Sequence, residues 1–289
     1  MKFITKLAVL MGIAAALLCA ACGGPAATDA GATTDSGGGG GPPDMMDMRL
    51  TTLNIQTPTT LGIVNGILAS RITDRSINIL LKNRALTSSP TVEVGDGEPG
   101  MGADEYIFPT CDTVAGLCTD GLTACTTSAD CGTSMFTASF DEATRNLETT
   151  SASTVSLNVG VDSDGDMIDD VIIALDLVNA AFDAYFDATY ANIEGMNANG
   201  TSILSGALLV EDACAIDVDL GGGAVLNLLD ILDGSGMGTN PPVLTMGMCA
   251  AGDGAMNIQP DTDADGDGMN DAYAVSARVA ASTITLVTM

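Results

Sequence analysis

The chain has 289 residues, 46% of them hydrophobic and 3% aromatic, and it carries 37 acidic side chains against 9 basic ones. A formal charge of −28 repels phosphate backbones, so nucleic acid is not expected as a partner and cations are favoured. The sequence contains no His, which excludes catalytic sites built on a Ser–His or Cys–His pair.

The first 21 residues have the pattern of a secretory signal peptide. Two lysines precede an apolar run over residues 7–18, which is too short for an ordinary membrane span. The segment "LCAAC", which ends at Cys22, resembles the bacterial lipoprotein signal, although Cys19 stands where that signal usually has Leu. The resemblance implies an exported chain held at the cell envelope, at the outer membrane of a Gram-negative-type cell, by lipid on Cys22. A plain secreted protein or an uncleaved anchor is the alternative.

Residues 22–48 consist mostly of Gly, Ala, Thr and Pro. Because such a segment has little apolar surface to bury, it predicts a flexible tether. The tether would join the lipid anchor to one folded domain over 49–289, with two domains as the alternative.

The first part of this domain shows two kinds of apolar periodicity. Alternating apolar residues predict a strand over 49–56 and a second strand over 76–82. The stretch between them predicts a helix, whose apolar face would carry Leu61, Val64, Leu68 and Ile72.

Six cysteines follow the tether, and an even number in an exported chain favours disulfides. These disulfide candidates are Cys111, Cys118, Cys125, Cys131, Cys214 and Cys249. The first four lie in a segment near 110–132 that resembles the small Cys-rich inserts of exported bacterial proteins. We interpret it as an insert closed by its own bridges, with Cys214 joined to Cys249. A zinc site is the alternative, although the cysteine spacings are wider than usual for zinc.

The remaining apolar segments favour strands. Strands are predicted over 153–161 and 171–178, a short helix over 223–232, and a strand near the C-terminus. One face of that last strand would carry Tyr273, Val275, Ala277 and Val279. The pattern predicts a mainly β, sandwich-like domain with a few short helices and a disulfide-rich insert.

The stretch "DADGDGMND" over 263–271 places Asp at alternating positions, with Gly266 and Gly268 between them. Calcium prefers such sets of oxygen ligands, and glycines permit the tight turn that brings them together. The ligands offered are Asp263, Asp265, Asp267, Asp271 and the backbone carbonyl of Met269. The stretch resembles the calcium loops of dockerins and thrombospondin type 3 repeats. It departs from an EF-hand at position twelve, where Ala274 replaces a bidentate Glu, and this departure predicts weak affinity.

A second stretch, over 162–170, has the same register. Its candidate ligands are Asp162, Asp164, Asp166, Asp170 and the backbone carbonyl of Ile168. The sequence has no Lys or Arg between Arg145 and Arg278, so acids in this part have no basic neighbour in sequence. They would be solvated, widely spaced, paired with a distant Arg or neutralised by bound cations. The alternative is that Asp and Gly simply form exposed turns.

Together these features predict a calcium-stabilised envelope lipoprotein with a structural or binding role rather than an enzyme. Its membrane contact would be the N-terminal lipid, and the sequence identifies no protein or surface partner. One alternative is an exported, calcium-dependent hydrolase with carboxylates as acid and base. Another is a periplasmic ligand-binding component.

Overall fold

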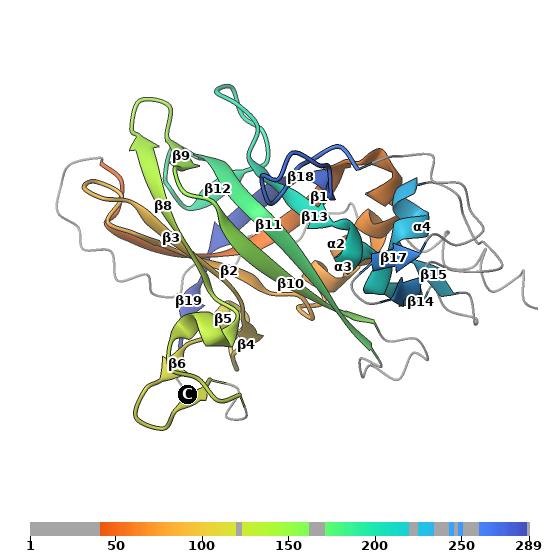
Figure 1. Cartoon of the computed structure of the whole chain (residues 1–289). Helices are drawn as coiled ribbons and strands as arrows, with labels where there is room; N and C mark the ends of the chain where they lie inside the picture. Colours follow the sequence, from red (N-terminus) through yellow and green to blue (C-terminus); the bar gives the residue numbers. More distant parts are fainter. Residues whose placement is uncertain are drawn as a thin grey trace, which may run out of the picture. The chain divides into compact units, whose positions relative to one another are not determined.

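The computed structural model describes residues 41–119, 123–161, 171–219, 225–233, 243–245, 248–250 and 260–287 (Figure 1). The chain separates into a unit that ends at Gly40 and a unit that begins at Gly41, and everything below belongs to the second. The predicted signal peptide over 1–21, the lipidation site Cys22 and the acidic loop over 162–170 lie outside the described residues.

The folded domain begins earlier than the sequence predicts. Strand β1 runs Met45–Thr57, so it starts ahead of the expected boundary at Arg49. Met46 and Met48 are buried in the core, with 6% and 0% of their surface exposed. Their apolar area stabilises strand pairing within the segment that was expected to be tether.

A ten-stranded antiparallel sheet forms the body of the domain. Its strands are β1, β2 (Ile79–Arg84), β3 (Thr91–Asp96), β8 (Ser134–Asp141), β9 (Asn146–Thr149), β10 (Ser153–Val161), β11 (Val171–Phe186), β12 (Asn192–Glu194), β13 (Ile203–Leu209) and β18 (Ala272–Thr283). Strand β18 pairs with both β13 and β1, and β1 pairs with β2. The pairing of β1 with β18 therefore connects the first and the last strand of the sheet in sequence.

The strands turn their apolar faces toward one core. Every residue predicted to share the inner face of the C-terminal strand is buried there: Tyr273, Val275, Ala277 and Val279. Leu81 of β2, Phe136 of β8 and Leu208 of β13 belong to the same hydrophobic cluster. The mainly β, sandwich-like fold predicted from the sequence is confirmed. Strands that are far apart in the sheet order, such as β2 and β13, cover the same hydrophobic core.

The helices are short, and the first of them follows the predicted pattern. The 3-10 helix η2 (Thr59–Val64) continues into α2 (Asn65–Thr73). Leu61, Leu68 and Ile72 from its predicted apolar face are buried in the core. A further helix, α3 (Val210–Ala215), follows directly on β13.

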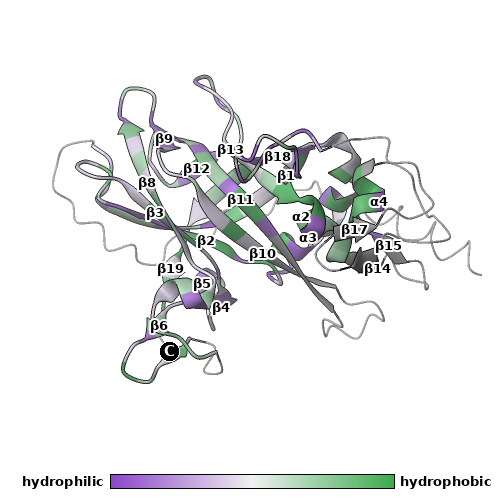
Figure 2. Cartoon of the chain, in the orientation of Figure 1, coloured by the Kyte–Doolittle hydropathy of each residue, from purple (hydrophilic) through white to green (hydrophobic). Residues whose placement is uncertain are grey.

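The segment over 223–232 differs from the single short helix that was predicted. Its described part starts at residue 225 with a strand, β15 (Val225–Asn227), and becomes helical only in α4 (Leu228–Asp233). The side-chain oxygen of Asn227 accepts a hydrogen bond of 3.0 Å from the amide of Leu229. An Asn oxygen that takes up a free amide in this way favours the start of a helix, so α4 begins only after Asn227. Figure 2 shows α4 as predominantly hydrophobic.

The Cys-rich insert is confirmed, and its bridges are local as predicted. Cys111 is joined to Cys125, and Cys118 is joined to Cys131. These sulfurs are therefore not available as thiolate ligands, and the zinc alternative is wrong for this segment. Cys214 is also disulfide-bonded, but the side chain of its predicted partner, Cys249, lies outside the description.

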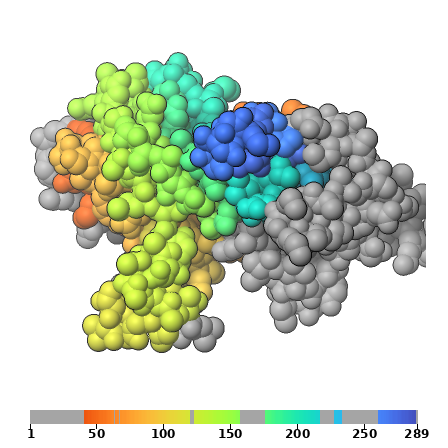
Figure 3. Space-filling model, in the orientation of Figure 1, coloured from red at the N-terminus to blue at the C-terminus, as the bar shows by residue number. Residues whose placement is uncertain are grey.

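Short strands and one 3-10 helix build the insert and its base. They are β4 (Glu98–Pro99), β5 (Glu105–Ile107), β6 (Cys111–Asp112), β7 (Leu117–Cys118) and η3 (Ser128–Cys131). In Figure 3 the insert, coloured yellow to lime, forms a lobe of its own. At its base, Tyr106 and Phe108 pack against Leu80 on the outer face of β2.

The remaining described strands pair locally. They are β14 (Asp217–Asp219) with β15, β16 (Val243–Thr245) with β17 (Met248–Ala250), and β19 (Thr285–Leu286), which runs parallel to β5. Within the described residues, no helix is long and apolar enough to cross a membrane.

Candidate metal centre

The acidic loop over 260–271 enters the sheet at the first residue of β18. Thr262 forms an isolated bridge with Ala272, which closes the loop at its base. The amide of Val210, at the start of α3, donates a hydrogen bond of 2.9 Å to the carbonyl oxygen of Asp271. The two ends of the loop are therefore held by β18 and α3, and only its middle projects into solvent.

Three of the predicted ligands come together in this loop. The carboxylate oxygens of Asp263, Asp265 and Asp267 lie within 4.8 Å of one another, and all three residues are exposed. We call them the Asp triad. Gly266 and Gly268 have φ values of 82° and 91°, in the left-handed region that glycine adopts without steric cost. The two glycines thus allow the turn that brings alternating carboxylates to one side, as the sequence predicts.

Backbone amides fix the orientation of the Asp triad. Asp263 accepts from the amides of Gly266 and Gly268, at 2.7 and 2.8 Å. Asp265 accepts from the amide of Asp267 at 3.0 Å, and Asp267 accepts from the amide of Met269 at 2.8 Å. Because the Gly268 and Gly266 amides donate to the ionised form of Asp263, they hold the pKa of its carboxyl below the usual value.

The other two predicted ligands of this loop have different positions. Asp271 is not a member of the Asp triad, and one of its carboxylate oxygens accepts a hydrogen bond of 2.8 Å from the amide of Ala264. Calcium ligation by Asp271 and by the backbone carbonyl of Met269 stays a prediction. Met269 donates its amide to Asp267, while its side chain is 70% exposed. The structure therefore gives Asp271 a role in closing the loop.

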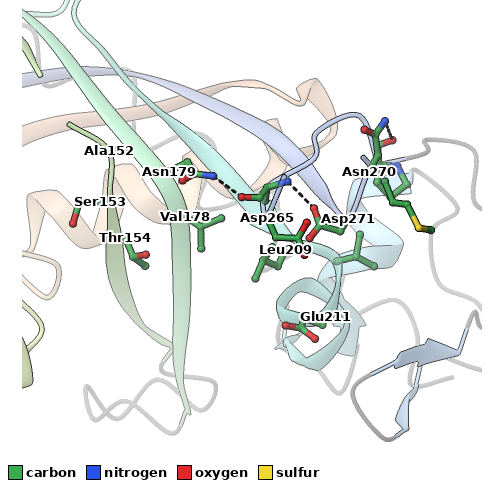
Figure 4. A pocket seen from close by; sticks show the side chains of 14 residues that line it. Ala152, Ser153, Thr154, Val178, Asn179, Leu209, Glu211, Asp265, Asn270 and Asp271 are labelled. Atoms are coloured by element: carbon green, nitrogen blue, oxygen red, sulfur yellow. Dashed lines mark hydrogen bonds between the residues drawn. The ribbon is translucent and has the colours of Figure 1, made fainter. Parts of the chain in front are cut away.

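Asn179 is a residue of this site that the sequence analysis missed. Its side-chain amide donates a hydrogen bond of 2.8 Å to the carbonyl oxygen of Ala264, which links β11 to the loop (Figure 4). Asn179 has a φ of 51°, a conformation that Asn tolerates better than most residues. A polar Asn inside an apolar strand could have indicated a role for this residue. The sequence does not identify Ala264 as its partner, because the two residues are 85 positions apart.

The donor set of the Asp triad fits a hard cation. Three carboxylates supply oxygen ligands, and calcium takes six to eight oxygens, with water completing the shell at exposed sites. The cluster contains no sulfur or nitrogen ligand, which is unlike the sites preferred by zinc or copper. The Asp triad would therefore hold calcium in preference to a softer metal. The second predicted loop, with Asp162, Asp164, Asp166, Ile168 and Asp170, lies outside the described residues.

A pocket of about 1080 Å³ lies beside the loop. One wall is formed by the loop itself, and the others come from the start of β10, the middle of β11 and the junction of β13 with α3 (Figure 4). In Figure 3 the C-terminal residues, in blue, lie against the teal residues of β13 and α3, in agreement with the pairing of β13 and β18. No protein family, curated protein or solved structure matches this chain, so the site is interpreted from its own residues.

Proposed function

We propose that this chain is a calcium-stabilised lipoprotein of the cell envelope with a structural or binding role. The observation that supports calcium most strongly is the Asp triad, in which three carboxylates lie within 4.8 Å of one another and are oriented by backbone amides. Carboxylates packed this closely repel one another, and a divalent cation removes that repulsion. A cation that binds only the folded loop stabilises the domain by mass action.

The proposed location rests on the sequence, with support from the disulfides. The signal-like segment before Cys22 would export the chain and leave a lipidated N-terminus. Two disulfides close the insert, and disulfides persist in the oxidising compartments outside the cytosol. We propose the outer membrane as the site of anchoring.

The test compares thermal unfolding of the protein in EDTA and after calcium is added back. We expect calcium to raise Tm for the wild type and to raise it less for Asp265→Asn, which removes one carboxylate of the Asp triad and leaves the second predicted loop over 162–170 unchanged. Asp141→Asn is the matched control, because Asp141 also accepts hydrogen bonds from its own turn but is not a member of the triad. An equal calcium response in wild type and Asp265→Asn would contradict the proposal.

The hydrolase alternative is favoured by one observation. Glu211, Asp265 and Asp271 line the same pocket, and acid–base hydrolysis uses a pair of carboxyl groups in one cleft. Its test is turnover of a panel of chromogenic glycosides and esters by wild type and by Glu211→Gln. Activity that disappears in the variant would establish this second function.

The ligand-binding alternative has less support. It needs an enclosed pocket, and an enclosed apolar cavity does lie in the core between Leu53, Leu68 and Leu208. Its volume is about 40 Å³, whereas pockets for small-molecule ligands hold about 300–1,000 Å³. This cavity is too small for a metabolite.

A further inference from the structure

The pocket beside the Asp triad combines two surface types. Its apolar part includes Leu209 and Val210, and Met269 from the loop, which is 70% exposed. Its polar part includes the carboxylates of Glu211 and Asp271. Such a surface can contact a partner that carries both apolar and charged side chains.

The charge of this pocket has one sign. Its described lining contains acids and amides but no Lys or Arg. Glu211 is exposed, and it makes no hydrogen bond or ion pair with any described residue. Burial, together with the nearby charges of Asp176 and Glu211, raises the pKa of Asp212, the residue that follows Glu211. A calcium ion in the Asp triad would offset only part of the triad's charge, so the pocket remains negative.

The size of the pocket favours a chain segment over a metabolite. Its volume of about 1080 Å³ is slightly above the range of about 300–1,000 Å³ for small-molecule pockets, and it opens to solvent, so an extended segment can enter and leave it. An extended segment can lay a basic side chain near Glu211 and an apolar one near Met269. A chain of charge −28 also attracts basic partners at long range.

We propose that the pocket between the acidic loop and α3 is the docking site for a basic, partly apolar segment of another protein. A Lys or Arg of that segment would pair with Glu211, and its apolar neighbour would contact Leu209 and Met269. The inference rests on the proposed function, because calcium bound to the Asp triad would hold the loop that forms one wall. The proposed binding role would then belong to this pocket, and the partner would be a protein with a basic, partly apolar segment.

The test is fluorescence polarisation of a labelled short peptide of alternating Lys and Leu, with the full chain in calcium. A peptide with Gln in place of Lys is the charge control. Glu211→Gln should weaken binding of the Lys peptide by about two- to fivefold, which is the effect of losing one exposed ion pair. Glu142→Gln, which alters an exposed acid outside the pocket, should leave binding unchanged.

The outcomes separate the two proposals, since the calcium response in Tm is measured on the same samples. A normal calcium response with equal binding by wild type and Glu211→Gln would overturn the docking site and leave the calcium proposal standing. No calcium response together with Glu211-dependent binding would overturn the calcium proposal alone. Equal binding of the Lys and Gln peptides, or displacement of the Lys peptide by an equal charge of spermidine, would overturn the assignment to a basic protein segment.

Discussion

The side-chain amide of Asn179 donates a hydrogen bond of 2.8 Å to the carbonyl oxygen of Ala264, and so connects β11 to the acidic loop. Ala264 in turn donates its amide to Asp271 at 2.8 Å. The loop that carries the Asp triad is therefore held on one side by a strand distant in sequence. Its geometry depends on the folded sheet as well as on its own glycines.

This link predicts the effect of Asn179→Gly. Glycine tolerates the φ of 51° at this position but cannot donate the hydrogen bond, so the free energy of unfolding should fall by about 0.5–1.5 kcal/mol. The calcium-induced rise in Tm should also shrink, because the loop is less well held. Asn199→Ala is the control, since Asn199 donates a comparable bond to Thr144 far from the loop. A calcium response as large in Asn179→Gly as in Asn199→Ala would contradict the role given to this link.

Substitution of Asn83 by Leu should stabilise the domain. This residue is fully buried in β2, and its side-chain oxygen and nitrogen both lack a hydrogen-bond partner. Asn83→Leu replaces the amide with an apolar group of similar size, so chemical denaturation should show an increase of about 1–3 kcal/mol in the free energy of unfolding.

Asn78 provides the contrasting variant, because both the oxygen and the nitrogen of its buried side-chain amide have a hydrogen-bond partner. Its oxygen accepts from Arg49 Nε at 2.9 Å, and its nitrogen donates to the carbonyl oxygen of Arg75 at 2.6 Å. Asn78→Leu should destabilise the domain, since it removes the acceptor of the buried Arg49 Nε, although a terminal nitrogen of Arg49 still donates to the carbonyl oxygens of Ile72 and Ile77. If Asn83→Leu lowered stability as Asn78→Leu does, the unpaired state assigned to Asn83 would be wrong.

The stabilising effect of the Asp130 carboxylate on the insert should depend on pH. The amides of Thr126 and Thr127 donate to its carboxylate and lower its pKa to about 2. Because the folded-state pKa lies below the usual 3.8, the contribution of Asp130 is present above that value and is lost as the pH falls toward 2. NMR titration of the Asp130 carboxyl carbon should give a midpoint near 2.

The matched variant is Asp130→Asn, which cannot ionise. Amide hydrogen exchange at Thr126 and Thr127 should be faster than in the wild type above pH 3.8, and the difference should shrink as the pH falls through about 2. A wild-type midpoint at the usual Asp value would show that these hydrogen bonds do not favour the ionised form.

Removal of the disulfide between Cys111 and Cys125 should destabilise the insert locally. Cys111 and Cys125 are 14 positions apart, and a bridge that closes a loop of this length contributes up to about 3 kcal/mol. A variant with both cysteines changed to Ala should lose hydrogen-exchange protection in the insert, while the calcium response stays unchanged. Loss of the calcium response would show that the insert and the acidic loop are coupled.

Local sequence patterns predicted those parts of the fold whose residues need no distant partner. Period-two alternation identified β18, and helical spacing identified η2 and α2, because these periods follow from backbone geometry. The register of alternating Asp and Gly likewise predicted the convergence of Asp263, Asp265 and Asp267. Pairing of β1 with β18 joins opposite ends of the domain, and no local pattern encodes such a pairing.

The same limit explains what was missed at the site. Asn179 lies in an apolar strand, and the sequence gives no sign that its partner is Ala264. The carboxylate of Asp271 accepts the amide of Ala264 within the same loop, and its place as a calcium ligand stays a prediction. The role of Asn179 depends on a contact 85 positions away, which no local pattern encodes.

The most direct test of the central claim is native mass spectrometry of the intact mature protein during a calcium titration. The account predicts a bound calcium ion that appears in the wild type and is lost in Asp265→Asn, on a chain whose mass includes lipid at Cys22. A wild-type spectrum without bound calcium at millimolar concentrations, where weak extracellular sites are filled, would contradict it.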